Sequence, residues 1–150
     1  MSEALGTALK LLGHRARSEA ELRRRLEAKG FAAAEIDSAV ARLQELRYLD
    51  DEAFAGSKAD SLLHSEHQGP RRVLRKLEAL GVDGEVASEA VASAQEGRTE
   101  RELALQALKR RRPRVDSGSP HEDRVKAARW LLGRGFPEDV VRELLRLDEE

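Results

Sequence analysis

The sequence of 150 residues predicts an all-α protein, an elongated and curved array of three tandem three-helix repeats. Three segments share one pattern, in which a leucine stands four places before a glycine and an apolar residue follows it: LRRRLEAKGF (22–31), VLRKLEALGV (73–82) and AARWLLGRGF (127–136). Their glycines are residues 30, 81 and 135, spaced by 51 and 54 residues, which is typical of repeat proteins. Abundant Ala, Leu, Glu and Arg favour helix. We place the repeats at 1–48, 49–97 and 98–150.

The first repeat is predicted to contain helices over about 4–14, 19–29 and 34–46. The first helix has one apolar stripe, formed by Leu5, Leu9 and Leu12. Ser18 and Glu21 have the spacing of a capping box at the start of the second helix, and Gly30 can end that helix in the left-handed conformation. The third helix turns apolar residues inward, namely Ile36, Val40 and Leu43. We expect Tyr48 and Phe54 to seat the first repeat against the second.

The other two repeats follow the same plan. In the second, helices are predicted from near 51, from Pro70 to Gly81 and over about 85–96, with proline at a favoured first helical position. In the third, they are predicted from near 98, over 120–133 and over about 137–147, with a loop at 113–120 and a second capping box formed by Ser119 and Glu122. Equivalent core positions lie six and ten residues after each glycine: Ile36, Ala87 and Val141, then Val40, Val91 and Leu145.

Composition and motifs argue against several classes of protein. The chain has no cysteine, which excludes disulfides and cysteine-based zinc sites. It has no apolar run of about 18 residues and no signal-peptide pattern, so we expect a cytoplasmic protein that does not enter membranes. It also lacks a glycine-rich phosphate loop. His64 and His67 have no convincing further metal ligands and are expected to be exposed at a helix end, while the carboxylates of 50–52 suit a helix N-terminus. We therefore expect no cofactor, no metal and no catalytic activity.

Basic residues recur at equivalent positions, although the formal net charge is only −1. Six residues before the three glycines stand Arg24, Arg75 and Arg129, nearly opposite the leucine stripe. Other basic residues surround this column or follow it in the chain: Arg25, Arg71, Arg72, Lys76, Lys126, and the run Lys109, Arg110, Arg111 and Arg112. Such a ladder would match phosphates or carboxylates on a repeating partner. The alternative is that these arginines only favour helix on solvent-exposed faces. Trp130 stands beside the column, and we expect it to be a partly exposed anchor.

Several motifs together resemble the RecX family of regulatory proteins. The first repeat has Arg15-x-x-Ser18-x-x-Glu21-Leu22, and the link to the second has Tyr48-Leu49-Asp50-Asp51-x-x-Phe54-Ala55. The later repeats have Gly69-Pro70-Arg71-Arg72-Val73 and Arg129-Trp130-Leu131 through Arg134-Gly135-Phe136. The resemblance implies a non-enzymatic regulator of the RecA recombinase in DNA repair, recombination and the SOS response. It also implies binding in the groove of the RecA–DNA filament, which would restrain filament extension, ATP hydrolysis and strand exchange.

The predicted function is therefore inhibition of RecA by a monomer that binds the RecA–DNA filament through the basic faces of all three repeats, with possible contacts to single- or double-stranded DNA. An alternative is a DNA-binding helical-repeat protein that acts without RecA through 109–114 and the middle basic helix. An enzyme acting on small molecules has less support, because it would need a pocket with a perturbed carboxylate pair.

Overall fold

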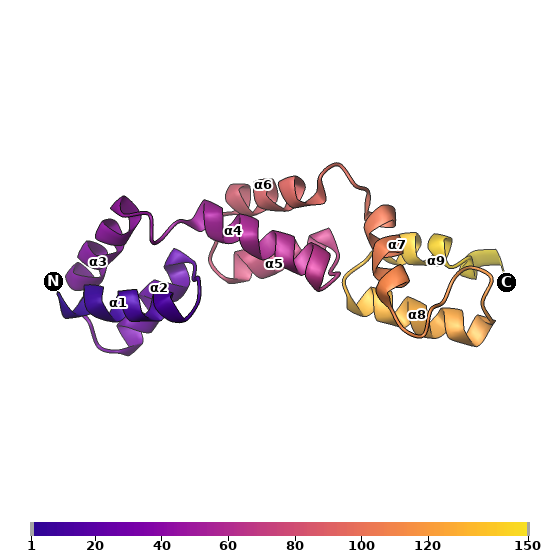
Figure 1. Cartoon of the computed structure of the whole chain (residues 1–150), viewed down its shortest axis with the longest axis horizontal. Helices are drawn as coiled ribbons and strands as arrows, with labels where there is room; N and C mark the ends of the chain where they lie inside the picture. The colour runs from indigo at the N-terminus through magenta and orange to yellow at the C-terminus, as the bar shows by residue number, and fades with distance from the viewer. Residues whose placement is uncertain (1, 150) are drawn as a thin grey trace. The chain divides into compact units, whose positions relative to one another are not determined.

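The computed structural model describes residues 2–149, and within them it contains helices and no strand. The prediction of an all-α fold is confirmed (Figure 1). The elements, in chain order, are α1 (Glu3–His14), α2 (Glu19–Ala28), α3 (Ala33–Glu45), α4 (Asp51–Asp60), a π-helical turn (Ser61–Ser65), α5 (Pro70–Ala79), α6 (Gly84–Gln95), α7 (Glu100–Arg110), α8 (His121–Gly133), α9 (Glu138–Leu144) and a 3₁₀ turn (Leu147–Glu149).

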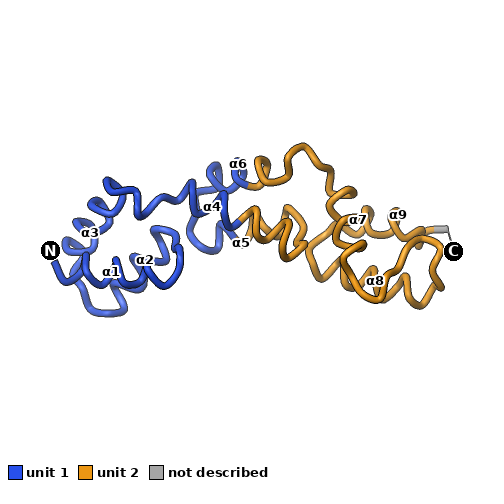
Figure 2. Tube along the Cα trace, in the orientation of Figure 1, with its two compact units in different colours: residues 1–58, 77–90 blue, residues 59–76, 91–150 orange. Residues whose placement is uncertain are grey.

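The chain divides into two compact units (Figure 2). Unit 1 contains residues 1–58 and 77–90, and unit 2 contains residues 59–76 and 91–150. The division falls inside α4, α5 and α6, so the middle helices contribute to both units. The repeat boundaries at 48/49 and 97/98 stay a prediction.

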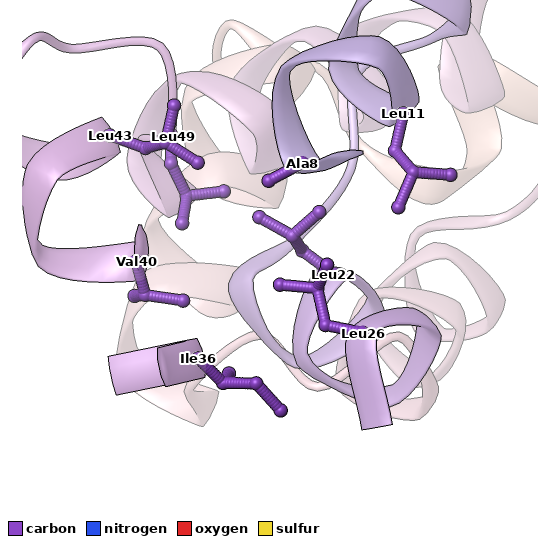
Figure 3. Close-up of a cluster of buried hydrophobic side chains, with 8 residues drawn as sticks. All are labelled: Ala8, Leu11, Leu22, Leu26, Ile36, Val40, Leu43 and Leu49. Atoms are coloured by element: carbon purple, nitrogen blue, oxygen red, sulfur yellow. The ribbon is translucent and has the colours of Figure 1, made fainter. Parts of the chain in front are cut away.

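Unit 1 is built around one apolar cluster to which α1, α2 and α3 all contribute. Figure 3 shows these side chains directed toward a common interior: Ala8, Leu11, Leu22, Leu26, Ile36, Val40, Leu43 and Leu49. The stripe predicted for α1 is rotated, because Ala4, Ala8 and Leu11 are buried while the three predicted leucines are only partly buried. All six core positions predicted after the glycines are buried. The regular spacing of the repeats therefore identified these six core positions correctly.

The three glycines end their helices in the same way. The φ angles of Gly30, Gly81 and Gly135 are +91°, +88° and +95°. In each repeat the amide after the glycine donates to the carbonyl oxygen five residues earlier, with distances of 3.3 Å to Leu26, 3.1 Å to Leu77 and 3.2 Å to Leu131. This is the Schellman arrangement, which uses the left-handed conformation that glycine adopts without a steric penalty.

A second repeated feature joins the start of one helix to the end of an equivalent helix. In unit 1 the Ser18 hydroxyl donates a hydrogen bond to the carbonyl oxygen of Leu80. In unit 2 the Gly69 amide donates to the carbonyl oxygen of Arg134 at 2.8 Å. The donors both lie twelve residues before a glycine, and the acceptors both lie directly before one. We call each of these pairs a cap junction.

Close packing accompanies both cap junctions. In unit 1 a Cβ atom placed on Gly81 would overlap the Cβ of Ala20. In unit 2 a Cβ atom on Gly135 would lie 2.6 Å from the Cβ of Arg72. Gly30 has the same backbone conformation, but no atom lies within 4 Å of the corresponding position. The glycines at 81 and 135 are thus required by φ and by packing, whereas Gly30 is required by φ alone.

Replacing Ser18 with alanine is expected to lower the free energy of unfolding by about 2 kcal/mol, because it removes an N-cap and leaves the Leu80 carbonyl without its donor. The Ser18 hydroxyl also accepts from the Glu21 amide at 3.2 Å. Thr99→Ala is the matched control, since Thr99 caps α7 but its hydroxyl bonds only within its own capping box. That control should cost about 1 kcal/mol. Urea unfolding followed by circular dichroism measures both, and equal losses would contradict a stabilising role for the cap junction.

The structure confirms one predicted capping box and contradicts the other. Ser18 and Glu21 form the box at the start of α2. At α8 the N-cap is Pro120, which offers no side-chain hydrogen bond. The hydroxyl of Ser119 instead accepts from the Asp116 amide at 3.0 Å. The Ser119 hydroxyl therefore stabilises the turn that begins at residue 116 and does not cap α8.

Two of the acidic residues at 50–52 accept hydrogen bonds from backbone amides at the starts of two different helices. Asp50 accepts from the Ala53 amide at 3.1 Å, which is the predicted interaction with the start of α4. Asp51 accepts from the Glu19 amide at 2.8 Å and so caps α2. Burial raises the pKa of the Asp51 carboxyl, and nearby acidic side chains add to this effect.

The prediction that Tyr48 seats two repeats together is wrong. Its side chain is 63% exposed, whereas Leu49 and Phe54 are buried. The reason lies in the turn after α3, where Arg47 has a φ of +61° and the Tyr48 amide donates to the Leu43 carbonyl oxygen at 2.9 Å. This turn carries Leu49 into the core and leaves Tyr48 in solvent.

Candidate functional site

The predicted basic column is exposed in the structure. Arg24, Arg75 and Arg129 lie on α2, α5 and α8 with solvent-exposed side chains. The leucines two residues further along each helix are buried, as the helical period requires. The second helix of each repeat therefore has an exposed cation at the same position. Binding through these cations stays a prediction.

The other predicted residues on the second helices have mixed environments. Arg25 and Lys126 are exposed, and Nζ of Lys126 lies 3.9 Å from the Glu122 carboxylate of its own helix. Lys76 is half-buried. Arg71 pairs with Glu100 at 3.1 Å. The half-buried Arg72 donates from Nη1 to the Gly133 carbonyl oxygen at 2.6 Å. Arg71 and Arg72 thus help to hold unit 2 together.

The basic run lies at the C-terminal end of α7, where two of its side chains donate to backbone carbonyl oxygens. Lys109, Arg110 and Arg112 are exposed. The guanidinium of Arg112 donates to the Lys109 carbonyl oxygen at 2.8 Å, and that of Arg111 donates to the Pro113 carbonyl oxygen at 3.1 Å. Cations at a helix C-terminus also interact favourably with the helix dipole. Three of these charges remain exposed to solvent, and binding through them stays a prediction.

Trp130 is the centre of a basic surface on unit 2. Its half-buried ring lies 5.9 Å from Cζ of Arg111 and 5.2 Å from Cζ of Arg134. Both distances suit cation–π interactions. The prediction of a partly exposed Trp130 agrees with this position. Arg134 was not among the predicted residues, although its i,i+4 spacing from Trp130 could have indicated the contact.

The charges of Arg110 and Arg134 also act on the imidazole of His67, so we group this residue with them. It follows the π-helical turn with a φ of +51° and is half-buried. Burial lowers the pKa of the His67 imidazole, and the charges of Arg110, Arg134 and His64 lower it further. We define the Trp130 surface as His67, Arg110, Arg111, Trp130 and Arg134.

The lowered pKa of His67 predicts a pH effect on stability. Below the ordinary pKa of 6.5 the unfolded chain takes up a proton more readily than the folded protein. The free energy of unfolding should therefore fall as the pH drops from 6.5 through the lower folded pKa, and then level off. His67→Gln should remove this part of the pH dependence. Urea unfolding of both proteins across this range tests it, and an unchanged slope in the variant would contradict the assignment.

The structure supplies no metal site in the part of the chain that it describes, since no three His, Asp or Glu residues there are grouped suitably. Nε2 of His64 lies 2.7 Å from the Ala94 carbonyl oxygen, and His67 lies beyond the helical turn that holds His64. Both histidines are half-buried, so the prediction that they are exposed was wrong.

No helix in residues 2–149 is long and apolar enough to cross a membrane.

Family models decide the relationship of this chain to known proteins. The first, second and third three-helix domains of RecX match residues 4–43, 50–91 and 99–145. The chain belongs to the RecX family. The family models also give the three-helix repeats their order and number, as the sequence predicted.

Individual RecX proteins are similar along nearly the whole chain. "Regulatory protein RecX" of a Thermus thermophilus strain is 40% identical over 99% of this chain and 94% of its own length. The protein of the same name from Chlorobaculum tepidum is 34% identical, covering 97% of this chain and 88% of its own. These relatives support a regulatory protein.

Solved RecX structures share the fold. The crystal structure of RecX from Lactobacillus salivarius matches with a TM-score of 0.76 and 20% identity, over 99% of this chain and 96% of its own. A second RecX crystal structure matches with a TM-score of 0.67, over 99% of this chain and 72% of its own. At this identity the likeness establishes the fold of the RecX repeats.

Proposed function

We propose that this RecX protein binds the filament that RecA forms on DNA and inhibits its ATP hydrolysis and strand exchange. It acts without catalysis, as a cytoplasmic monomer. The observation that carries the proposal is an exposed arginine at the same position in the second helix of each repeat. These arginines are Arg24, Arg75 and Arg129. A filament repeats its own anionic groups, and a protein that repeats its cations can meet several of them at once.

The proposed contacts extend beyond these three arginines. They include the neighbouring basic residues of the second helices and the end of α7: Arg25, Arg71, Arg72, Lys76, Lys109, Arg110, Arg111, Arg112 and Lys126. The exposed members would approach the partner directly. Arg71 and Arg72 would act chiefly by holding unit 2 in shape, because both are engaged within it.

A binding comparison tests the proposal. Fluorescence anisotropy would follow the protein on a labelled single-stranded oligonucleotide, once bare and once coated with RecA in a non-hydrolysable ATP analogue. We expect tighter binding to the coated strand at every salt concentration. Equal or weaker binding to the coated strand would overturn a filament-specific function.

Direct DNA binding without RecA is the second candidate, and the Trp130 surface favours it. Four charged or aromatic groups from the ends of α7 and α8, with His67 beside them, form a patch that suits phosphates and one exposed base. This function predicts affinity for bare DNA that falls steeply with salt. The net charge of −1 gives the whole protein little general attraction to DNA.

A further inference from the structure

Four arginines and one glutamate surround a depression of about 310 Å³ in unit 1. They are Arg15, Arg17, Glu21, Arg24 and Arg25, from the α1–α2 link and the first turns of α2. We call this depression the arginine pocket. Its lining carries four positive charges against one negative charge.

Two of the arginines are held in place. Arg17 is buried, with 8% of its surface exposed, and its Nε donates to the Leu11 carbonyl oxygen at 3.3 Å. Nη2 of Arg15 lies 2.7 Å from Oε2 of Glu21. Oε1 of the same carboxylate accepts from the Ser18 amide at 3.1 Å. The single carboxylate of the pocket is therefore already engaged with Arg15 and with the helix cap.

The other three arginines have no carboxylate within ion-pair distance in the described part of the chain. Within residues 2–149, Arg17, Arg24 and Arg25 form no ion pair. Burial lowers the pKa of the Arg17 guanidinium, the positive charges of Arg15 and Arg25 lower it further, and the charge of Glu21 offsets only part of this effect. A bound anion would relieve this mutual repulsion.

The other repeats show that the fold does not need the positive charge of Arg17. Thirteen residues before the glycine, Arg17 corresponds to Gln68 in the second repeat and to Glu122 in the third. Gln68 is buried at 5% exposure, so a neutral side chain fills the equivalent position there. A positive charge at position 17, beside the basic residues that recur at the positions of Arg24 and Arg25, is thus particular to the first repeat.

We infer that the arginine pocket binds a phosphate group of a nucleic-acid backbone. Guanidinium groups at several sides of one depression suit the tetrahedral oxygens of a phosphate better than a planar carboxylate, which two parallel donors satisfy. The inference deepens the proposed function and rests on it, because the filament that the protein binds contains DNA. It assigns the DNA contact of the first repeat to Arg15, Arg17, Arg24 and Arg25.

The test compares two double variants of the full chain. Arg17→Gln with Arg25→Gln removes two charges from the pocket, and the glutamine copies the second repeat. Arg42→Gln with Arg47→Gln removes two exposed charges of the same unit outside the pocket. Because Arg17 is buried, a third double variant changes only Arg24→Gln with Arg25→Gln. Circular dichroism checks that each variant keeps its helicity.

Binding to a bare single-stranded oligonucleotide is measured against salt. Both pocket variants should weaken it by about tenfold and lower the salt slope by roughly 0.7, since the pocket holds one phosphate and each single-strand phosphate contact contributes about 0.7. The control variant should change the affinity by less than about twofold. NMR signals of the Arg17 and Arg25 Nε–H groups should shift on adding the oligonucleotide, and shift little with an uncharged methylphosphonate strand.

Other outcomes overturn the inference and differ from failure of the proposed function. Equal weakening by pocket and control variants would mean general electrostatic attraction. Shifts as large with inorganic phosphate at the same concentration would indicate a small-anion site. Weaker binding to RecA-coated DNA with unchanged binding to bare DNA would indicate an acidic protein surface. In the last case the proposed function stands while the phosphate site falls.

Discussion

Gly81→Ala is expected to lower the free energy of unfolding by about 3 kcal/mol, against about 1 kcal/mol for Gly30→Ala. Both glycines have a φ near +90°, at which an alanine is strained by roughly 1 kcal/mol or more. Only at Gly81 would the new Cβ overlap another side chain, that of Ala20. Relieving such an overlap in packed structure costs about 1–3 kcal/mol. The difference between the two variants therefore measures the close packing at the cap junction of unit 1.

A double-mutant cycle isolates this contact. Ala20→Gly removes the Cβ that the alanine at 81 would meet, at a helix-propensity cost of about 1 kcal/mol. In that background Gly81→Ala should cost about as little as Gly30→Ala does, so the coupling between the two sites should be about 2 kcal/mol. Urea unfolding at equilibrium gives all the values. Additive effects would contradict contact between Ala20 and Gly81.

Removing the three repeated arginines together should have the largest effect on function. The variant with Arg24, Arg75 and Arg129 each changed to glutamine should bind the RecA–DNA filament about a hundredfold more weakly, because each exposed ion pair contributes up to about 1 kcal/mol. Its helicity should be unchanged, since all three side chains are exposed and form no ion pair within residues 2–149.

The matched control changes Arg42, Arg101 and Arg142 to glutamine. These arginines are also exposed, but each already pairs with a carboxylate of this chain, at 3.1, 3.5 and 3.2 Å. Both triple variants take the formal net charge from −1 to −4, a loss of three positive charges. Filament binding and ATPase inhibition should survive in the control. Equal losses in both variants would mean that net charge, and not the repeated position, governs binding.

The sequence predicted the helices well because their signals are local. Gly30, Gly81 and Gly135 mark helix ends through a backbone conformation that depends on few neighbours, and the structure has all three with positive φ. The core positions after each glycine follow from helical period alone. Ser119 shows where a local signal fails, because a competing turn from Asp116 takes up the hydroxyl.

The candidate site was harder to predict because it depends on contacts between distant residues. The pair of Ser18 with Leu80 and the grouping of His67 with Arg134 join positions more than 60 residues apart in the chain. Tyr48 was placed wrongly because the left-handed turn at Arg47 gives no sequence signal as strong as a glycine. Arg15 and Arg17 stand in an ordinary helix link, and only the folded structure brings them to one pocket with Arg24 and Arg25.

RecA ATP hydrolysis on single-stranded DNA, with this protein titrated in, tests the central claim most directly. A parallel titration onto the same DNA without RecA measures binding to DNA alone. The proposed function predicts that the rate of ATP hydrolysis falls when far less than one copy of this protein is present per RecA. At the same concentrations little of the protein should bind bare DNA. Unchanged hydrolysis at full occupancy of the DNA would contradict it and would favour the direct DNA-binding function.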